Sequence, residues 1–287
     1  MGLFAGYAAE QWRLSVCSQE KGEYRLAKIV PLFSGSKGNS YYVGSGSSGI
    51  LIDAGRSCKQ LETALCDNDL DSKKIQAVFI THEHSDHCTA LKVFASRYKI
   101  PVYASAGTLE MLLKTGRLDK RISTYVIEDS VCVGDMKIIR TDTPHDAAES
   151  CCYSVCTSDG RRALIATDIG RMTDKIRSAA AESDAVVIES NHDVNMLKTG
   201  LYPYELKRRI MSATGHLSNE ACSDELPDFI AQNTNRFILG HLSRENNTPE
   251  LALQTALCAL EMKKMRRNID FTISVAPEVT NGERLVF

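Results

Sequence analysis

The sequence is most constrained by a cluster of metal-binding side chains, His82-Glu83-His84-Ser85-Asp86-His87, which directly follows the apolar run Ala77–Ile80. Such a run is typical of a buried strand. Residues two apart in an extended chain point to the same side, so His82 and His84 face one volume. Asp86 and His87 follow where the backbone can turn. Imidazoles with a carboxylate suit a divalent cation, Zn²⁺ or, as the carboxylate share rises, Mn²⁺. The alternative is a polar turn with solvated histidines.

The composition is that of an ordinary globular protein. Of the 287 residues, 43% are apolar and 24% are charged, which allows one large α/β domain or two smaller ones. The net charge of −2 argues against a protein that coats nucleic acid non-specifically. It is compatible with a local basic groove beside a metal site, because the cations there carry charge themselves.

Cysteine content and hydropathy indicate the compartment. The ten cysteines are not preceded by a hydrophobic signal segment, which favours free thiols in a reducing cytoplasm. Apolar runs stay well short of the roughly 20 residues that span a bilayer, so no membrane partner is expected. Nothing in the sequence indicates an oligomeric state.

Strands and helices alternate along most of the chain. Residues 1–26 show no hydrophobic period and stay unassigned as an N-terminal extension, whereas residues 27–287 are expected to form one domain. Polar residues follow the strand ends, which suggests a layered α/β fold with its site along one sheet edge. Expected strands lie at 27–33, 41–43, 49–52, 77–80, 101–104, several segments within 123–166, 184–188, 236–239 and 271–275. Expected helices lie at 57–66, 88–98, 106–115, 203–213, 217–231 and 249–263.

Two features before the histidine cluster each have two interpretations. The glycine- and serine-rich loop Ser34–Ser40 is either a plain hairpin turn or a loop that presents backbone N–H groups and Asn39 to an anion. Asp53, at a strand end, either caps the following helix or orients a ligand histidine.

The histidines share one kind of position. Each lies beside a turn or a strand end, and none lies within the core of an expected helix. Random placement would scatter some of them onto helices and surfaces, so convergence on one site is the simpler explanation. They are His82, His84, His87, His145, His192, His216 and His241.

The series His82-x-His84-x-Asp86-His87, His145, Asp168 and His241 resembles the motif series of the metallo-β-lactamase fold, from about residue 28 to the end. The resemblance implies a four-layer αββα architecture, with two mixed sheets packed face to face and helices outside. It also implies two divalent metal ions at the strand ends. One would be held by His82, His84 and His145, and the other by Asp86, His87 and His241. Asp168 would bridge the two ions, and Asp53 would orient the ligand loop.

Within that superfamily the chain is similar to the YycJ/WalJ group of exonuclease-like proteins. The similarity implies phosphodiester cleavage from a 5′ end, with DNA rather than RNA as the nucleic-acid partner. The extension 1–26 departs from it, because the resemblance would start the protein near Lys28. The matching segments are Ser34–Asn39, His145–Ala147, Thr167–Gly170, Glu189–Asp193, Tyr202–Pro203 ahead of Leu206–Ile210, Gly215–Asn219 and His241–Asn246.

The expected reaction is in-line attack on phosphorus. Two metals about 3.5–4 Å apart would deprotonate a bridging water, the nucleophile, and neutralise phosphate oxygens. The leaving oxygen then needs a proton, and His216 with Glu189 is the best remaining pair for that step. The alternative for His216 is to cap the helix that starts near Ser218. Together with the ligand Asp86, this pair forms the expected catalytic group.

Substrate contacts are expected from a further set of polar residues. For His192 the alternative is a supporting role behind the ligands, and for Asn219, Ser243 and Asn246 it is capping of helix N-termini. The densest basic groups, around 207–209 and 263–267, are typical of solvated helix faces. No basic groove with interleaved aromatic residues is visible, so stacking of a single strand is not supported. The expected substrate or phosphate contacts are Ser36, Lys37, Asn39, His192, Asn219, Ser243 and Asn246.

Three other functions are compatible with the same metal-binding residues. One is an RNA-processing endonuclease of the tRNA 3′-processing type, and another is a hydrolase of a lactam, thioester or cyclic phosphate. The third is a binding or regulatory protein without turnover. The complete set of seven ligands argues against the third.

Overall fold

The computed structural model describes residues 27–45 and 48–287, which form two seven-stranded sheets packed face to face. The first sheet has the order β14-β1-β2-β3-β4-β5-β6, and its strands are β1 Lys28–Phe33, β2 Ser40–Ser45, β3 Ser48–Ile52, β4 Ile75–Phe79, β5 Val102–Ala104, β6 Thr124–Val126 and β14 Leu285–Val286. The second has the order β13-β12-β11-β10-β9-β8-β7, and its strands are β7 Ser130–Val133, β8 Met136–Asp142, β9 Cys151–Thr157, β10 Arg162–Ala166, β11 Ala185–Glu189, β12 Arg236–Gly240 and β13 Thr272–Val275.

Both sheets are mixed. In the first, β14, β1, β2 and β3 pair antiparallel, and β3 to β6 pair parallel. In the second, β7 to β10 pair antiparallel, and β10 to β13 pair parallel. The carboxyl ends of adjacent parallel strands lie at one sheet edge, which is where ligands bind in α/β proteins.

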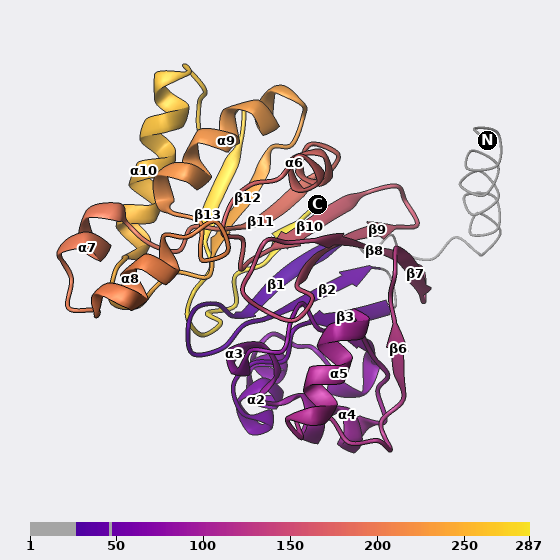
Figure 1. The fold of residues 1–287 in the computed structure, drawn as a ribbon. Helices are drawn as coiled ribbons and strands as arrows, with labels where there is room; N and C mark the ends of the chain where they lie inside the picture. Colours follow the sequence, from indigo (N-terminus) through magenta and orange to yellow (C-terminus); the bar gives the residue numbers. More distant parts are fainter. Residues whose placement is uncertain (1–26, 46–47) are drawn as a thin grey trace, which may run out of the picture.

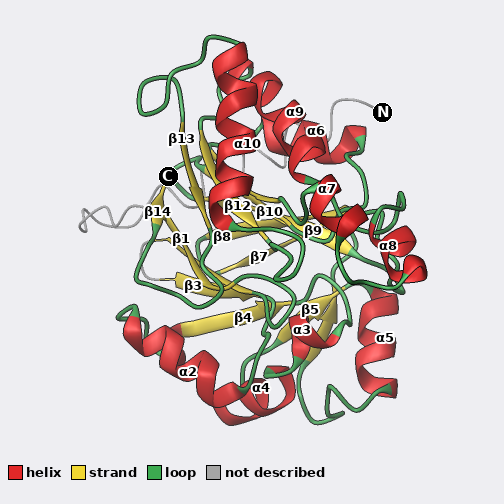
Figure 2. Cartoon of the chain, turned by 90° about the vertical axis from the view of Figure 1, so that its left-hand side faces the viewer, coloured by secondary structure: helices red, strands yellow, loops and turns green. Residues whose placement is uncertain are grey.

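Helices cover the outer face of each sheet (Figure 1). The first sheet is covered by α2 Cys58–Asp67, α4 Leu91–Tyr98 and α5 Ala106–Lys114, and the second by α6 Asp174–Ala181, α9 Asn219–Ala231 and α10 Pro249–Met262. Figure 2 shows the resulting order of helices, sheet, sheet and helices from bottom to top. The predicted four-layer αββα architecture is therefore confirmed. Shorter elements are η1 Ser72–Lys74, α3 Ser85–Cys88, α7 Val194–Thr199 and α8 Tyr204–Ile210.

Three layers of buried apolar side chains hold the fold together. The middle layer lies between the sheets and includes Ile29, Phe79 and Tyr153. The two outer layers lie between each sheet and its helices, represented by Phe94 in one and Phe237 in the other. Because both faces of each sheet are covered, central strands such as β11 are buried throughout rather than alternating between buried and exposed residues.

Most helices begin at a residue whose side chain accepts a backbone N–H from the first turn. This arrangement satisfies one of the donors that a helix start leaves without an intrahelical partner. The capping residues are Ser57 for α2, Ser105 for α5, Thr173 for α6, Asp193 for α7, Ser218 for α9 and Thr248 for α10.

The structure differs from the sequence expectation in a few elements. The helix expected over 88–98 begins only at Leu91, because α3 forms a separate turn before it. Helices α6 and α7 and strand β14 were not expected. Helix α6 buries only Ile176 and Ala180, a stripe too narrow to recognise in a sequence, and β14 exists through pairing with β1. The proposed extension, residues 1–26, lies outside the described residues. Every helix among the described residues is too short or too polar to cross a membrane.

We predict that the contact between the sheets depends strongly on Phe79. Its ring is fully buried, with centroids 4.9 Å from Tyr103 and 5.4 Å from Tyr153. Phe79→Ala should lower the free energy of unfolding by about 3–5 kcal/mol through lost transfer energy and a cavity. Phe79→Leu, the matched control, should lose no more than about 1.5 kcal/mol. Urea denaturation at constant m-value measures both, and equal small losses would contradict the prediction.

Candidate metal centre

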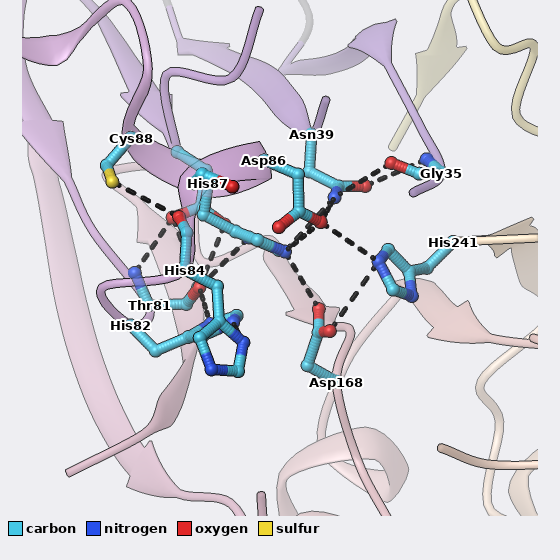
Figure 3. Close-up of polar contacts among 12 residues, drawn as sticks. Gly35, Asn39, Thr81, His82, His84, Asp86, His87, Cys88, Asp168 and His241 are labelled. Atoms are coloured by element: carbon cyan, nitrogen blue, oxygen red, sulfur yellow. Dashed lines mark hydrogen bonds and ion pairs between the residues drawn. The ribbon is translucent and has the colours of Figure 1, made fainter. Parts of the chain in front are cut away.

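The predicted site residues lie at strand ends of both sheets. His82 to His87 follow β4 and Asp53 follows β3 in the first sheet. In the second sheet Asp168 follows β10, Glu189 ends β11, His241 follows β12, and His145 lies in the loop from β8 to β9. The packing of the sheets brings these loops together at one edge, as Figure 3 shows for His87 from the first sheet and for Asp168 and His241 from the second.

Three of these residues adopt a left-handed backbone conformation. The φ angles are 61° for Asp53, 58° for Asp168 and 56° for His241. Positive φ is uncommon outside glycine but most accessible to Asn, Asp and His. Each residue comes one or two positions after its strand, so the sharp turn ends the strand and leaves the side chain at the sheet edge.

One set of donors is made of three imidazoles. His84 Nδ1 lies 3.1 Å from His82 Nε2 and 3.3 Å from His145 Nε2. Burial lowers the pKa of His82 well below its ordinary value and also lowers the pKa of His145. Both rings are therefore neutral at pH 7, which is the form that binds a metal ion. Three nitrogens that converge in this way fit a divalent cation.

A second set combines one carboxylate with two imidazoles. Asp86 Oδ2 lies 3.3 Å from His87 Nε2 and 3.6 Å from His241 Nε2. His241 Nε2 is buried and has no hydrogen-bond partner among the described residues. A buried polar nitrogen without a partner is costly, and a cation between these three side chains would satisfy it.

Asp168 lies between the two sets. Its Oδ2 is 3.2 Å from His87 Nε2, and its Oδ1 is 3.5 Å from His241 Nε2 and 3.7 Å from His145 Nε2. The Oδ2 atom is buried and makes no hydrogen bond within the described part of the chain. Burial raises the pKa of Asp168, but positive charge on His241 and His87 outweighs it and holds the pKa well below its ordinary value. The carboxylate is thus ionised and faces both sets.

Of the five histidines in the two donor sets, four are oriented by a contact to the ring nitrogen that faces away from the centre. Such contacts fix the orientation of each ring and direct its other nitrogen toward the centre, where that nitrogen can bind a metal once it is deprotonated. The partners are Thr81 Oγ1 for His82 Nδ1 at 3.0 Å, Asp53 Oδ2 for His87 Nδ1 at 2.7 Å, the Gly215 carbonyl for His145 Nδ1 at 3.0 Å and Glu189 Oε1 for His241 Nδ1 at 3.0 Å.

Asp53 fixes the position of the cluster that follows β4. Besides His87, its carboxylate accepts hydrogen bonds from the Thr81 backbone N–H at 2.8 Å and the Thr81 hydroxyl at 2.9 Å. The following helix is capped by Ser57, not Asp53. Of the two sequence interpretations, the geometry thus matches the orienting one. Gly55 is required nearby, because a Cβ there would lie 2.1 Å from the Asp86 carbonyl oxygen.

The glycine-serine loop contacts the second donor set through Asn39. The Asn39 Nδ2 atom is 3.1 Å from Asp86 Oδ2 and 3.0 Å from His87 Nε2. Its Oδ1 accepts the Gly35 N–H at 2.9 Å, which closes the loop. Asn39 is fully buried, whereas Ser36 and Lys37 are exposed at the loop tip.

His216 and Glu189 form a hydrogen-bonded pair beside Asp168. His216 Nδ1 donates to Glu189 Oε1 at 2.7 Å and lies 3.7 Å from Asp168 Oδ1. Glu189 is fully buried, and its Oε2 accepts backbone N–H groups of Ile169 and Leu217. Burial raises the pKa of Glu189, but the positive charges and hydrogen bonds of His216 and His241 lower it to about 2. Ser218 caps α9, so His216 is not needed for that purpose.

The remaining predicted contact residues are buried. The Asn219 amide makes reciprocal hydrogen bonds with the Asn247 amide at 2.8 and 2.9 Å and accepts from the Ser190 hydroxyl. Ser243 Oγ accepts the Asn246 N–H at 3.2 Å. His192 is 2% exposed, with Nδ1 3.3 Å from Asn191 Oδ1. The structure therefore does not bring Asn219 to the open side of the centre, and neither α9 nor α10 is capped by these residues.

Sequence reasoning missed several contacts that shape the centre. Asn191 Nδ2 donates to the His241 carbonyl at 2.8 Å. The guanidinium of Arg209 donates two hydrogen bonds to the carboxylate of Asp146, the residue after His145. Glu83 accepts the Ala148 N–H at 2.9 Å and thereby connects the cluster after β4 to the His145 loop. The only sequence signal for Asp146 and Glu83 is that each is a polar residue directly beside a predicted ligand.

Comparisons with known proteins agree with this geometry. A family model described as the beta-lactamase superfamily domain matches residues 49–241. Exodeoxyribonuclease YycJ of Bacillus anthracis is 38% identical over 235 residues, covering 81% of this chain and 88% of that protein. Exodeoxyribonuclease WalJ of Streptococcus pneumoniae is 34% identical over 250 residues, covering 86% and 93%.

Among solved structures, the metallo-β-lactamase-fold protein YhfI of Bacillus subtilis superimposes with a TM-score of 0.67 at 16% identity, covering 90% of this chain and 99% of that one. At this identity the likeness shows the fold alone, whereas the family model and the two relatives cover most of the sequence. The chain therefore belongs to the β-lactamase superfamily and, within it, to the YycJ/WalJ family.

Proposed function

We propose that this protein is a metal-dependent DNA exonuclease that removes nucleotides from the 5′ end of a strand. The observation that carries the proposal is the 34–38% identity to proteins named exodeoxyribonucleases over 88–93% of their lengths. The convergence of two donor sets on one bridging carboxylate supports it, because phosphodiester hydrolysis benefits from two adjacent cations.

In this proposal His82, His84 and His145 would hold one divalent ion, Asp86, His87 and His241 would hold the other, and the Asp168 carboxylate would contribute to both. The bound ions would lower the pKa of a shared water and neutralise charge on the phosphate oxygens. The imidazole-rich donors favour Zn²⁺, and the two carboxylates are compatible with Mn²⁺. Asn39, in contact with both Asp86 and His87, holds the second set in place.

His216 is the proposed proton donor to the leaving oxygen. Its Nδ1 is taken by Glu189, so Nε2 is the nitrogen left for a substrate. Its side chain is 16% exposed beside the buried Asp168. The ionised Glu189 accepts the Nδ1–H of His216 and so fixes the orientation of the ring. Glu189 thus acts through His216 as a positioning residue.

We expect degradation of end-labelled DNA to report the polarity. With a 5′ label, labelled mononucleotide should appear first, without labelled fragments of intermediate length. With a 3′ label, progressively shorter fragments should accumulate. Denaturing gels of single- and double-stranded DNA and of RNA, incubated with protein loaded with Zn²⁺ or Mn²⁺, measure both. Internal cuts confined to RNA would contradict the exonuclease proposal.

Asp168→Ala should abolish metal binding and activity while the fold persists. Removing a shared ligand should reduce metal affinity and activity by more than 10–100-fold, which is the loss caused by removing an orienting partner. Metal content per chain, turnover of bis-p-nitrophenyl phosphate and circular dichroism measure the three properties. The control is Asp174→Ala, which removes a fully exposed carboxylate at the start of α6. Wild-type turnover in Asp168→Ala would refute the bridging role.

His216→Ala should reduce kcat on DNA by about 10²–10⁴-fold, the usual contribution of general acid catalysis. The loss should be far smaller on a p-nitrophenyl ester, because p-nitrophenolate leaves without a proton. Metal content should be unchanged, since the two proposed donor sets do not include His216. Equal losses on DNA and on the ester would show that His216 does not donate the proton.

A further inference from the structure

The segment from α7 to α8 forms an arm that leaves the metal centre and returns to it. It starts after Glu189 and ends before His216, and these two side chains are hydrogen-bonded to each other at 2.7 Å. Helices α7 and α8 lie at the outside of the molecule in both views (Figure 1 and Figure 2). Residues 194–211 are called the arm below.

The arm carries an exposed stripe of apolar and basic side chains. Leu201 is 102% exposed, Tyr204 is 73% exposed and Met211 is 45% exposed. Arg208, with a side chain 69% exposed, lies between them. Tyr204 and Arg208 are spaced i and i+4, so they share one face of α8, and Met211 directly follows the end of that helix. The opposite face is buried through Ile210. Exposed apolar groups gathered on one face are typical of a binding surface.

The charge on the arm selects the kind of partner. Residues 194–211 contain one acidic residue, Glu205, and four basic residues, Lys198, Lys207, Arg208 and Arg209. Glu205 pairs with Arg208 at 3.0 Å, both side chains being largely exposed, so the pair contributes little and can open. No ion pair of Lys198 or Lys207 exists among the described residues, and Lys207 Nζ donates to the Lys198 carbonyl. An aromatic ring among cations suits a single nucleic-acid strand, whose bases stack and whose phosphates are anionic. The sequence pattern does not indicate such a surface, because it does not reveal that Tyr204 and Arg208 are both exposed on α8.

The arm is also fixed to the metal centre. Arg209 binds Asp146 through two nitrogens, and Asp146 follows the ligand His145. The Asp146 N–H donates to the Thr214 carbonyl, and His145 Nδ1 donates to the Gly215 carbonyl. Gly215 packs so closely that a Cβ would lie 2.2 Å from the carbonyl oxygens of Arg209 and Ile210. Arg208 of the stripe is therefore adjacent in sequence to Arg209, which is joined through Asp146 to His145 of the first donor set.

We propose that the exposed face of α8 holds the single-stranded part of the substrate beside the metal centre, with Tyr204 stacked on a base and Arg208 paired with a phosphate. The proposal rests on the nuclease function proposed above and adds the surface that retains the strand. Neither residue contacts the donor sets, so the surface is expected to act on binding and not on the chemical step.

The test compares Tyr204→Ala/Arg208→Ala with the wild-type protein, both loaded with metal. The probe is a fluorescein-labelled oligothymidylate with phosphorothioate linkages, which resist hydrolysis. Its Kd, from fluorescence anisotropy, should rise about fivefold or more, because loss of stacking alone costs that much per base. Turnover of thymidine 5′-(p-nitrophenyl phosphate), too short to reach the arm, should stay unchanged. An unchanged Kd, or an equal loss on both substrates, would overturn the proposal.

Single variants separate the two roles. Arg208→Ala should lower the slope of log Kd against log salt concentration by about 0.7, the value for one phosphate contact with a single strand. Tyr204→Ala should leave that slope unchanged, and Tyr204→Phe and Arg208→Lys should retain wild-type affinity. An unchanged slope in Arg208→Ala would remove the phosphate contact from the proposal.

The matched control is Met262→Ala/Lys263→Ala, which also removes an exposed apolar residue and a cation. These residues lie at the far end of α10, about 20 Å along that helix from its start. The Kd of this control variant should be that of the wild type, and a loss of affinity equal to that of the arm variant would overturn the proposal.

A changed sedimentation coefficient with unchanged Kd in the arm variant would assign the face to a second copy of the chain instead. Wild-type protein that binds the probe but degrades no nucleic acid would contradict the nuclease function and leave the binding surface supported.

Discussion

The site depends on the burial of one carboxylate, Asp168, among imidazoles from both sheets. An isolated ionised carboxylate at 2% exposure would be very costly, and only opposite charge or a cation offsets that cost. Its neighbours His87 and His145 belong to loops from different sheets. The centre is therefore complete only when the sheets are packed on each other, so the inter-sheet core around Phe79 supports chemistry as well as stability.

Local spacing accounts for what the sequence could predict. The pairing of His82 with His84 follows from their alternation after a strand, and all seven predicted ligands meet because each lies at a strand end on the same edge. Asn219 shows where such reasoning ends. It was expected at the substrate, but its amide is bound to that of Asn247, a partner 28 residues away that no local pattern reveals. Arg209 and Asp146, 63 residues apart, are a second case.

Orientation of the ligands also depends on distant partners. Asp53 was recognisable as an acid at a strand end, and it holds His87 and Thr81 together. Glu189 does the same on the second sheet for His241 and His216. Each sheet thus supplies one buried acid that orients imidazoles of the centre. The two halves contribute in a similar way, as their shared pattern of three antiparallel and three parallel strand pairs would suggest.

Selectivity must come from outside this centre. The same donors would bind the same cations in a lactamase or a nuclease. Bound metal ions polarise a carbonyl oxygen as well as a phosphoryl oxygen, so they do not by themselves select the substrate. What differs is the surface through which a substrate arrives. The arm is joined to the predicted ligand His145 through Arg209 and Asp146. A strand held on α8 would reach the centre beside His216, five residues after the end of the arm. Retention of the polymer and protonation of its leaving oxygen would therefore depend on neighbouring parts of the chain.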